Sequence, residues 1–280
     1  MSELLLPFQF PFMQNAFWIS MLLAPPTAIL SCFLILKGWS LMGDALSHAV
    51  LPGIVAAYIF NIPLVIGAFA AGMFCAVSIG YLKENSRVKQ DTIMGVVFSG
   101  MFGFGMVIYT KISTNVHLDH ILFGNMLGID SQDLWTGLII GGGVTLLLLF
   151  RAKDLLLHAF DPVQAQAIGL PVRLLNYGLL ALLSLTIVAT LKAVGLILAI
   201  GLLIVPGAIA FLLTRTFWSM VVVAVAVTLV AMFAGVYASF WLDSSSGPTI
   251  ILVLMIFFII AFIYRQLANW ATSKRTAASI

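Results

Sequence analysis

An aspartate and a histidine stand four residues apart in a stretch of the chain that is otherwise largely apolar. The stretch is GWSLMGDALSHAVLPG, residues 38–53, and the two residues are Asp44 and His48. On a helix this spacing places both side chains on one face, within reach of one small ion. A carboxylate oxygen and an imidazole nitrogen together suit divalent cations such as Mn(II), Fe(II) and Zn(II). The pair is therefore a candidate metal site.

Two other interpretations of the pair stay open on sequence grounds. In the first, the side chains form a buried hydrogen bond, with Ser40 or Ser47 satisfying their remaining polar atoms. In the second, both groups lie near a membrane surface, because Lys37 is close in sequence. A charged side chain at the centre of a bilayer costs about 2.5–3.5 kcal/mol even on a permissive scale, so the pair needs a partner or a polar cavity in every case.

The composition identifies the surroundings of this pair as a membrane. Of 280 residues, 62% are hydrophobic and only 8% are charged, and the mean hydropathy is +1.15. Soluble domains carry about a quarter charged residues. The chain therefore reads as an all-α, polytopic bundle of membrane helices, with one membrane domain over residues 1–280. Its net charge of +3 follows from its membrane topology and does not indicate binding to nucleic acid.

Apolar runs long enough to cross about 30 Å of hydrocarbon recur along the chain. We predict about nine spans, with eight as the alternative, because the second span holds Asp44, His48 and Pro52. The predicted spans lie at about 16–37, 41–60, 62–82, 92–110, 134–150, 172–191, 194–213, 218–240 and 248–266.

Most lysines and arginines fall on alternate loops. Basic residues mark the cytoplasmic loops of membrane proteins, so we expect a cytoplasmic C-terminus and an external N-terminus, retained at the membrane interface. Only Lys111 and Lys192 fall on the predicted external side. The residues on the predicted cytoplasmic side are Lys37, Lys83, Arg87, Lys89, Arg151, Lys153, Arg173, Arg215, Arg265, Lys274 and Arg275.

The segment FDPVQAQAIGLP lies in one of these predicted cytoplasmic loops. Asp161 is a plausible N-cap, Pro162 fits the first helical turn, and Gly169 fits the helix end. We therefore predict a short helix at about 161–169 on the cytoplasmic face. An ordinary amphipathic connector is the alternative. On the same side, we expect His158 to lie at the interface.

Enzymatic functions find no support in the sequence. The chain lacks H-E-x-x-H, the motif of zinc proteases. Ser47 and His48 are adjacent, so on a helix they diverge by about 100° and cannot act as nucleophile and base. The chain also lacks the G-x-x-x-x-G-K-[ST] phosphate loop, so it cannot hold ATP by that device.

Several motifs together resemble the permease subunits of ATP-binding-cassette importers for manganese, iron and zinc. The first is the stretch that holds Asp44 and His48, and the similarity runs in order through nearly the whole chain. The other motifs are DHILFGNMLGI (119–129), FDPVQAQAIGLP (160–171), AVGLILAIGLLIVPGAIAFLL (193–213) and DSSSGPTIIL (243–252).

This resemblance implies that Asp44 and His48 line a metal site in the translocation path, with the metal as cargo and no permanently bound cofactor. It implies two cytoplasmic ATPase subunits, a second permease subunit, identical or related, and an extracytoplasmic metal-binding protein. The location would be a bacterial cytoplasmic (inner) membrane, crossed several times. The segment that engages the ATPase would contain Asp161, Pro162, Ala165 and Gly169.

A stand-alone proton-coupled transporter or channel for a divalent cation is the alternative function. The FDPVQAQAIGLP segment argues against it, because a gradient-driven carrier has no ATPase to engage. The identity of the metal stays open among manganese, iron and zinc. His117, Asp119 and His120 cluster in a predicted outer loop, where solvated polarity is the simpler interpretation and metal capture the alternative.

The predicted topology can be tested by cysteine labelling. With Cys32 and Cys75 replaced, we expect Arg87→Cys to resist an impermeant thiol reagent in intact spheroplasts and to react after lysis, because residues 83–91 should face the cytoplasm. Lys111→Cys serves as the external control. Labelling of residue 87 from outside would contradict the orientation.

Overall fold

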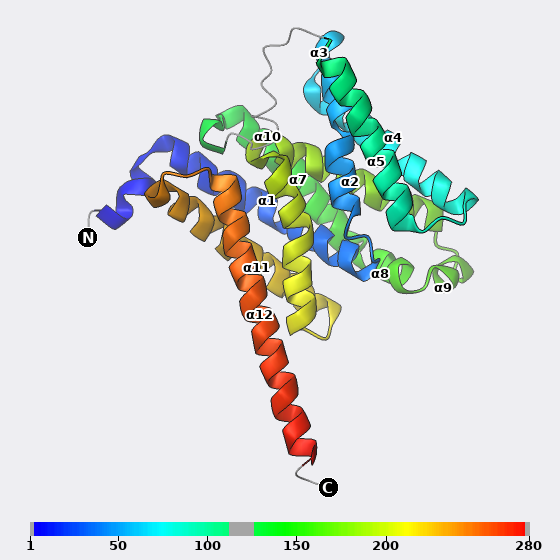
Figure 1. Ribbon diagram of the computed structural model, residues 1–280, viewed down its shortest axis with the longest axis vertical. Helices are drawn as coiled ribbons and strands as arrows, with labels where there is room; N and C mark the ends of the chain where they lie inside the picture. Colours follow the sequence, from blue (N-terminus) through cyan, green and yellow to red (C-terminus); the bar gives the residue numbers. More distant parts are fainter. Residues whose placement is uncertain (1–2, 112–125, 278–280) are drawn as a thin grey trace.

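The computed structural model describes residues 3–111 and 126–277, and all regular elements within these residues are helices. Figure 1 shows them packed side by side, with the last helix extending well beyond the others. The elements in chain order are η1 (Glu3–Gln9), α1 (Pro11–Leu36), α2 (Met42–Ala49), α3 (Leu51–Ile59), α4 (Leu64–Asn85), α5 (Gln90–Tyr109), η2 (Met126–Gly128), α7 (Ser131–Phe150), α8 (Ala152–Phe160), α9 (Pro162–Ala167), α10 (Val172–Leu213), α11 (Phe217–Leu242) and α12 (Ser246–Ala277).

Within the described residues, eight segments are long and apolar enough to cross a membrane. The predicted all-α, polytopic membrane bundle is confirmed, with eight long spans. Helices α2 and α3 together form one of them, Met42–Ile59, so the polar residues of the second predicted span do not prevent it from being helical. The remaining predicted span, 194–213, corresponds to a shorter apolar helix, Ile197–Leu213.

Helix α10 reverses its direction within its own length. Its 42 residues would extend about 63 Å if the helix were straight. Yet Asn176, near its start, accepts a hydrogen bond from Lys37 at the end of α1. Just beyond its last residue, Phe217 packs against Phe33 of α1 with ring centroids 5.1 Å apart. Both ends of α10 therefore lie at the same end of the bundle.

The reversal occurs at Gly195, whose φ of 78° and ψ of 173° are not helical. A positive φ of this kind costs glycine little, whereas other residues rarely adopt it. Figure 1 shows the second part of α10 returning along the bundle. The predicted boundary between the spans 172–191 and 194–213 lies at this break.

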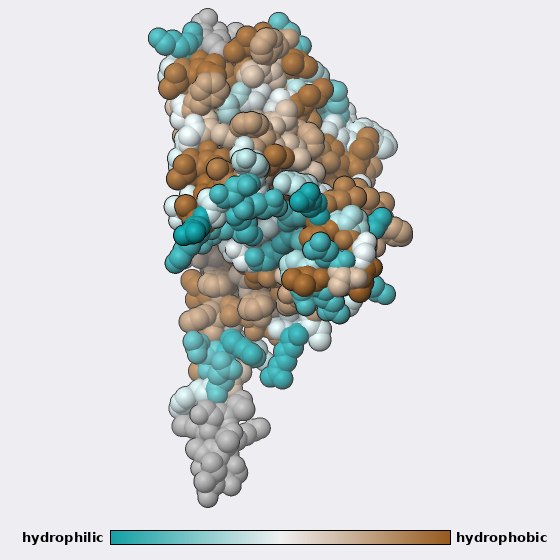
Figure 2. Space-filling view, turned by 90° about the vertical axis from the view of Figure 1, so that its right-hand side faces the viewer, coloured by the Kyte–Doolittle hydropathy of each residue, from teal (hydrophilic) through white to brown (hydrophobic). Residues whose placement is uncertain are grey.

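The two ends of the bundle differ in polarity. At one end, the Lys37 amine contacts His158 and Asn176, each at 3.1 Å. At the other end, Asn15 donates a hydrogen bond to the Ile129 carbonyl at 3.0 Å. Figure 2 shows hydrophilic side chains gathered near the α4–α5 turn and α8–α9, with hydrophobic side chains above them. The loops that the charge pattern assigned to one side thus lie together.

Helices α3 and α4 approach each other through two facing glycines. A Cβ atom added at Gly53 would overlap the backbone carbonyl of Gly67, and a Cβ at Gly67 would overlap that of Gly53. Small residues allow membrane helices to pack with their backbones in close contact.

We expect Gly53→Ala to destabilise the protein by about 1–3 kcal/mol, because the added methyl group meets backbone that cannot rotate away. Gly142→Ala in α7 is the matched control, since no atom lies within 4 Å of a Cβ placed there. Thermal unfolding of the detergent-solubilised variants would measure both changes. Equal midpoints for the two variants would contradict the close-packing role of Gly53.

Candidate functional site

Asp44 and His48 form a contact on α2. The Asp44 Oδ1 atom lies 3.2 Å from the His48 Nε2 atom, as the four-residue spacing on a helix predicts. Ser47 takes no part in this contact, since its hydroxyl donates to the carbonyl of Gly43 at 2.7 Å. The pair therefore depends on groups outside its own helix for further bonds.

Two phenylalanines of α5 hold the imidazole ring in place. The ring of His48 stacks on Phe98 at 5.6 Å between centroids and meets Phe102 edge-on at 5.2 Å. Its Nδ1 atom is buried and has no hydrogen-bond partner among the described residues. An unpaired buried polar atom is costly, so the aromatic contacts fix the ring without satisfying it.

The pair is partly open and lies within the membrane span. The His48 side chain is 26% exposed and that of Asp44 is 31% exposed. Asp44 lies in the first turn of α2, and at 1.5 Å per residue His48 lies about 9 Å beyond Met42 along the helix. The site is thus inside the span, nearer to the end of the bundle that carries Lys37. Facing lipid, a carboxylate at this depth would be costly.

The described residues alone do not complete a metal site here. Among the residues described, no group of three or more His, Cys, Asp or Glu side chains gathers to hold an ion. Protein metal sites use three or four ligands for zinc and more for harder cations. Asp44 and His48 can supply one oxygen and one nitrogen, and an ion held here would need further ligands from outside the described residues.

The short helix expected at about 161–169 is present as α9, and its boundaries follow from local chemistry. The Asp161 carboxylate accepts a hydrogen bond from the Gln164 amide at 2.8 Å, which confirms it as the N-cap. Pro162 is the first residue of the helix. Gly169 has a φ of 83°, the left-handed conformation that ends many helices.

The faces of α9 differ sharply in exposure. Ala165 is fully buried and anchors the helix against the bundle. Val163 is 78% exposed and Ile168, just after the helix, is 61% exposed, while Phe160 before it is 67% exposed. Three large apolar side chains thus point away from the bundle beside the basic loops, a pattern typical of a surface that another protein covers.

His158 on α8, which was expected at the membrane interface on the side of the basic loops, is buried at the end of the bundle where those loops lie. The side chain is only 5% exposed, and its Nε2 atom lies 3.1 Å from the Lys37 amine. Lys37 donates a second hydrogen bond to the Asn176 Oδ1 atom, also at 3.1 Å. No sequence signal identifies this cluster, because His158 and Asn176 lie 121 and 139 residues from Lys37 in the sequence.

Burial dominates the electrostatics of this cluster. Desolvation lowers the pKa of Lys37 to about 8, and the nearby Lys83 adds to the effect. Desolvation likewise lowers the pKa of His158, with Lys37 as the next cause. At neutral pH the cluster therefore combines a charged lysine with a neutral imidazole. His117, Asp119 and His120 lie outside the described residues.

Comparison with known proteins gives concordant matches. Residues 9–265 match the ABC 3 transport family. The chain is 57% identical over 261 residues to the chelated iron transport system membrane protein YfeD of Yersinia pestis, covering 93% of this chain and 88% of that protein. It is 48% identical over 257 residues to the manganese transport system membrane protein MntB of Synechocystis sp., and the match covers 92% of this chain and 84% of that protein.

A solved structure agrees in fold. The structure of PsaBC from Streptococcus pneumoniae in complex with Fab superposes with a TM-score of 0.85 at 35% sequence identity. The match covers 93% of this chain and 95% of that chain.

Proposed function

The chain belongs to the ABC 3 transport family, and we propose that it carries a divalent transition metal ion into the cytoplasm, manganese or iron first and zinc as the alternative. As a family member it is a multi-pass permease subunit and not an enzyme, and a separate subunit hydrolyses ATP. Relatives named for manganese and chelated iron transport support this choice of cargo. A stand-alone carrier does not fit a chain of this family.

The observation that carries the proposal is the contact between Asp44 and His48 inside a membrane span. A dehydrated dication in a medium of low dielectric needs a negative charge close to it, and the carboxylate supplies one. The imidazole adds a nitrogen ligand that favours transition metals over calcium or magnesium. Because the ion is cargo, two ligands from this chain are an advantage: they bind without trapping it.

We propose that a second permease subunit, identical or related, covers this pair and supplies the missing ligands. The partial exposure of Asp44 and His48 supports this, because lipid could not solvate the carboxylate. An extracytoplasmic metal-binding protein would deliver the ion at the opposite end of the bundle. The bacterial inner membrane, with the basic loops in the cytoplasm, fits this arrangement.

We further propose that α9 is where the ATPase subunit docks. Its buried Ala165 and exposed Val163 and Ile168 give it one face for the bundle and one for a partner. Asp161, Pro162 and Gly169 act on the ends of the helix and fix its length. The ATPase would thus meet a short, rigid element at the basic end of the bundle.

We expect Asp44→Asn to lower metal uptake at least about tenfold, since it removes the charge but keeps the size and one oxygen. We expect His48→Gln to reduce uptake similarly. The measurement is radioactive Mn(II) uptake by proteoliposomes that contain the whole transporter, normalised to folded protein. Ser47→Ala is the control, because the Ser47 hydroxyl bonds only its own helix.

A structural hydrogen bond without metal binding predicts a different result. Asn would keep a bond to His48, and any loss would follow protein amount instead of uptake per molecule. Wild-type uptake by Asp44→Asn at equal protein would therefore overturn the metal-site assignment.

We expect Gly169→Val to uncouple ATP hydrolysis from transport, whereas Gly169→Asn should retain most coupling. No atom lies within 4 Å of a Cβ at this position, so the difference comes from the backbone alone. A left-handed conformation costs an ordinary residue roughly 1–2 kcal/mol, and asparagine tolerates it best. The ratio of metal transported to ATP hydrolysed measures the effect. Equal ratios for the two variants would show that coupling does not require the left-handed conformation at this helix end.

A further inference from the structure

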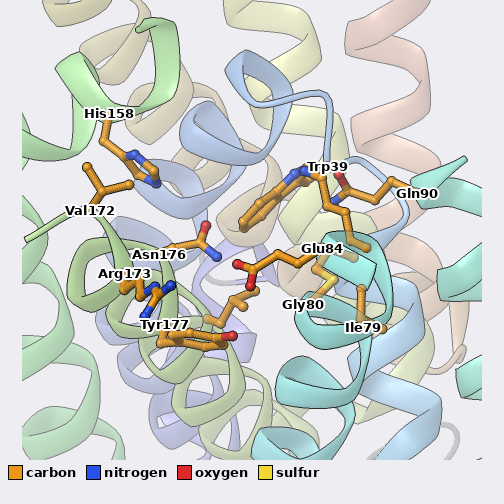
Figure 3. A pocket seen from close by; sticks show the side chains of 13 residues that line it. Trp39, Ile79, Gly80, Glu84, Gln90, His158, Val172, Arg173, Asn176 and Tyr177 are labelled. Atoms are coloured by element: carbon orange, nitrogen blue, oxygen red, sulfur yellow. The ribbon is translucent and has the colours of Figure 1, made fainter. Parts of the chain in front are cut away.

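A cavity of about 260 Å³ lies at the basic end of the bundle, away from the Asp44–His48 pair. Trp39, which precedes α2, and Tyr177 of α10 form part of its wall. Figure 3 shows side chains from α4, α8 and α10 directed into it. Its polar and charged lining residues are Lys83, Glu84, Gln90, His158, Arg173 and Asn176.

The hydrogen-bond arrangement makes this cavity rich in donors. The Lys37 ammonium group can only donate, so the His158 Nε2 atom that it contacts must accept. The proton of the neutral imidazole then sits on Nδ1, which is buried and has no partner among the described residues. Lys37 also occupies the Asn176 oxygen, which leaves the amide NH₂ group of Asn176 to donate. One buried N–H donor, at His158 Nδ1, thus lacks an acceptor among the described residues, and the half-buried Asn176 adds a second donor group.

The charged groups around the cavity are predominantly positive, which also favours an acceptor ligand. Lys83 and Arg173 line it and Lys37 adjoins it, against one carboxylate, Glu84. In the described part of the chain the ion pairs are Asp44–His48 and Arg151–Asp154. The cations of the cavity therefore have no salt bridge there. Lys37 and Lys83 even approach the same Trp39 ring, at 4.0 and 5.8 Å from its centroid.

We propose that this cavity binds a phosphate group. Arginine presents a planar fork of donors that matches phosphate oxygens, and lysine adds a point charge. The volume is smaller than the roughly 300–1,000 Å³ of pockets for drug-sized ligands, so it suits a phosphate with a small substituent better than a nucleotide. The His158 and Asn176 donors occupy the inner wall, while Lys83 and Arg173 stand at the exposed mouth.

Two sources can supply this group. The cavity lies where α1 and α4 end and α10 begins, which is the level of lipid headgroups, so an anionic phospholipid is one source. Free phosphate in the cytoplasm is the other. Either would join α4, α8 and α10 at the end of the bundle where α9 lies, and would relieve the repulsion between the lysines.

The test uses the full-length permease, depleted of lipid in a neutral detergent. Its thermal unfolding midpoint is followed as phosphatidylglycerol, inorganic phosphate at constant ionic strength, or diacylglycerol with the same acyl chains is added. We expect stabilisation by phosphatidylglycerol, inorganic phosphate or both, and none by diacylglycerol. Arg173→Gln and Lys83→Gln should each weaken the apparent affinity about tenfold, the effect of losing one charge-assisted hydrogen bond.

Lys83 and Arg173 are exposed, so their variants should fold. Arg215→Gln is the matched control, because Arg215 is an exposed arginine outside the cavity lining. A response to phosphatidylglycerol alone identifies a lipid headgroup, and a response to inorganic phosphate supports a soluble anion as well. No response to either, an equal response to diacylglycerol, or an equal loss in Arg215→Gln would overturn the proposal.

Discussion

Hydrocarbon offers no hydrogen-bond partner, and this constraint shapes the placement of polar side chains in the bundle. The hydroxyls of Ser20, Thr27 and Thr228 all donate to carbonyls of their own helices, at 2.6–2.7 Å. Each therefore satisfies itself within one turn and needs nothing from a neighbour. Asp44 and His48 differ, because they bond to each other and remain partly open. Among the described residues, they are a polar pair within a membrane span that stays accessible to an outside ligand.

The same constraint shapes the reversal in α10. A chain that turns back within the membrane must break few backbone hydrogen bonds, and a single non-helical residue, Gly195, achieves this. The returning segment then packs on α1, where the Ser31 hydroxyl accepts a hydrogen bond from the Gly207 amide at 2.9 Å. Gly43 beside the candidate site packs against Leu203 of the same segment. The returning half of α10 thus supports the helix that carries Asp44.

Local chemistry explains what the sequence could predict. The spans follow from hydrophobic length, and the contact between Asp44 and His48 follows from their spacing on a helix. The ends of α9 follow from the capping of Asp161 and the left-handed Gly169. The packing of Phe98 against His48 joins residues 50 positions apart, and no local sequence pattern predicts this contact.

Long-range pairing also explains the burial of His158. From the sequence alone, a histidine in a basic loop is expected to be in contact with solvent. In the fold, the end of α1 and the start of α10 close over it and bury 95% of its surface. Sequence patterns indicate which face of an element is apolar. They do not indicate which distant polar group forms a hydrogen bond with a buried polar group.

The Lys37 cluster connects the two regions that the proposed function requires. Helix α8 is separated from α9 by one residue, Asp161, and its His158 bonds Lys37. Lys37 in turn lies on Trp39, at the entry to the helix that carries Asp44. Hydrogen bonds to charged groups are worth about 1.5–3 kcal/mol each, so the contact between Lys37 and His158 resists separation of α8 from the α1–α2 connection. The proposed docking helix and the candidate metal site are therefore joined through one half-buried lysine.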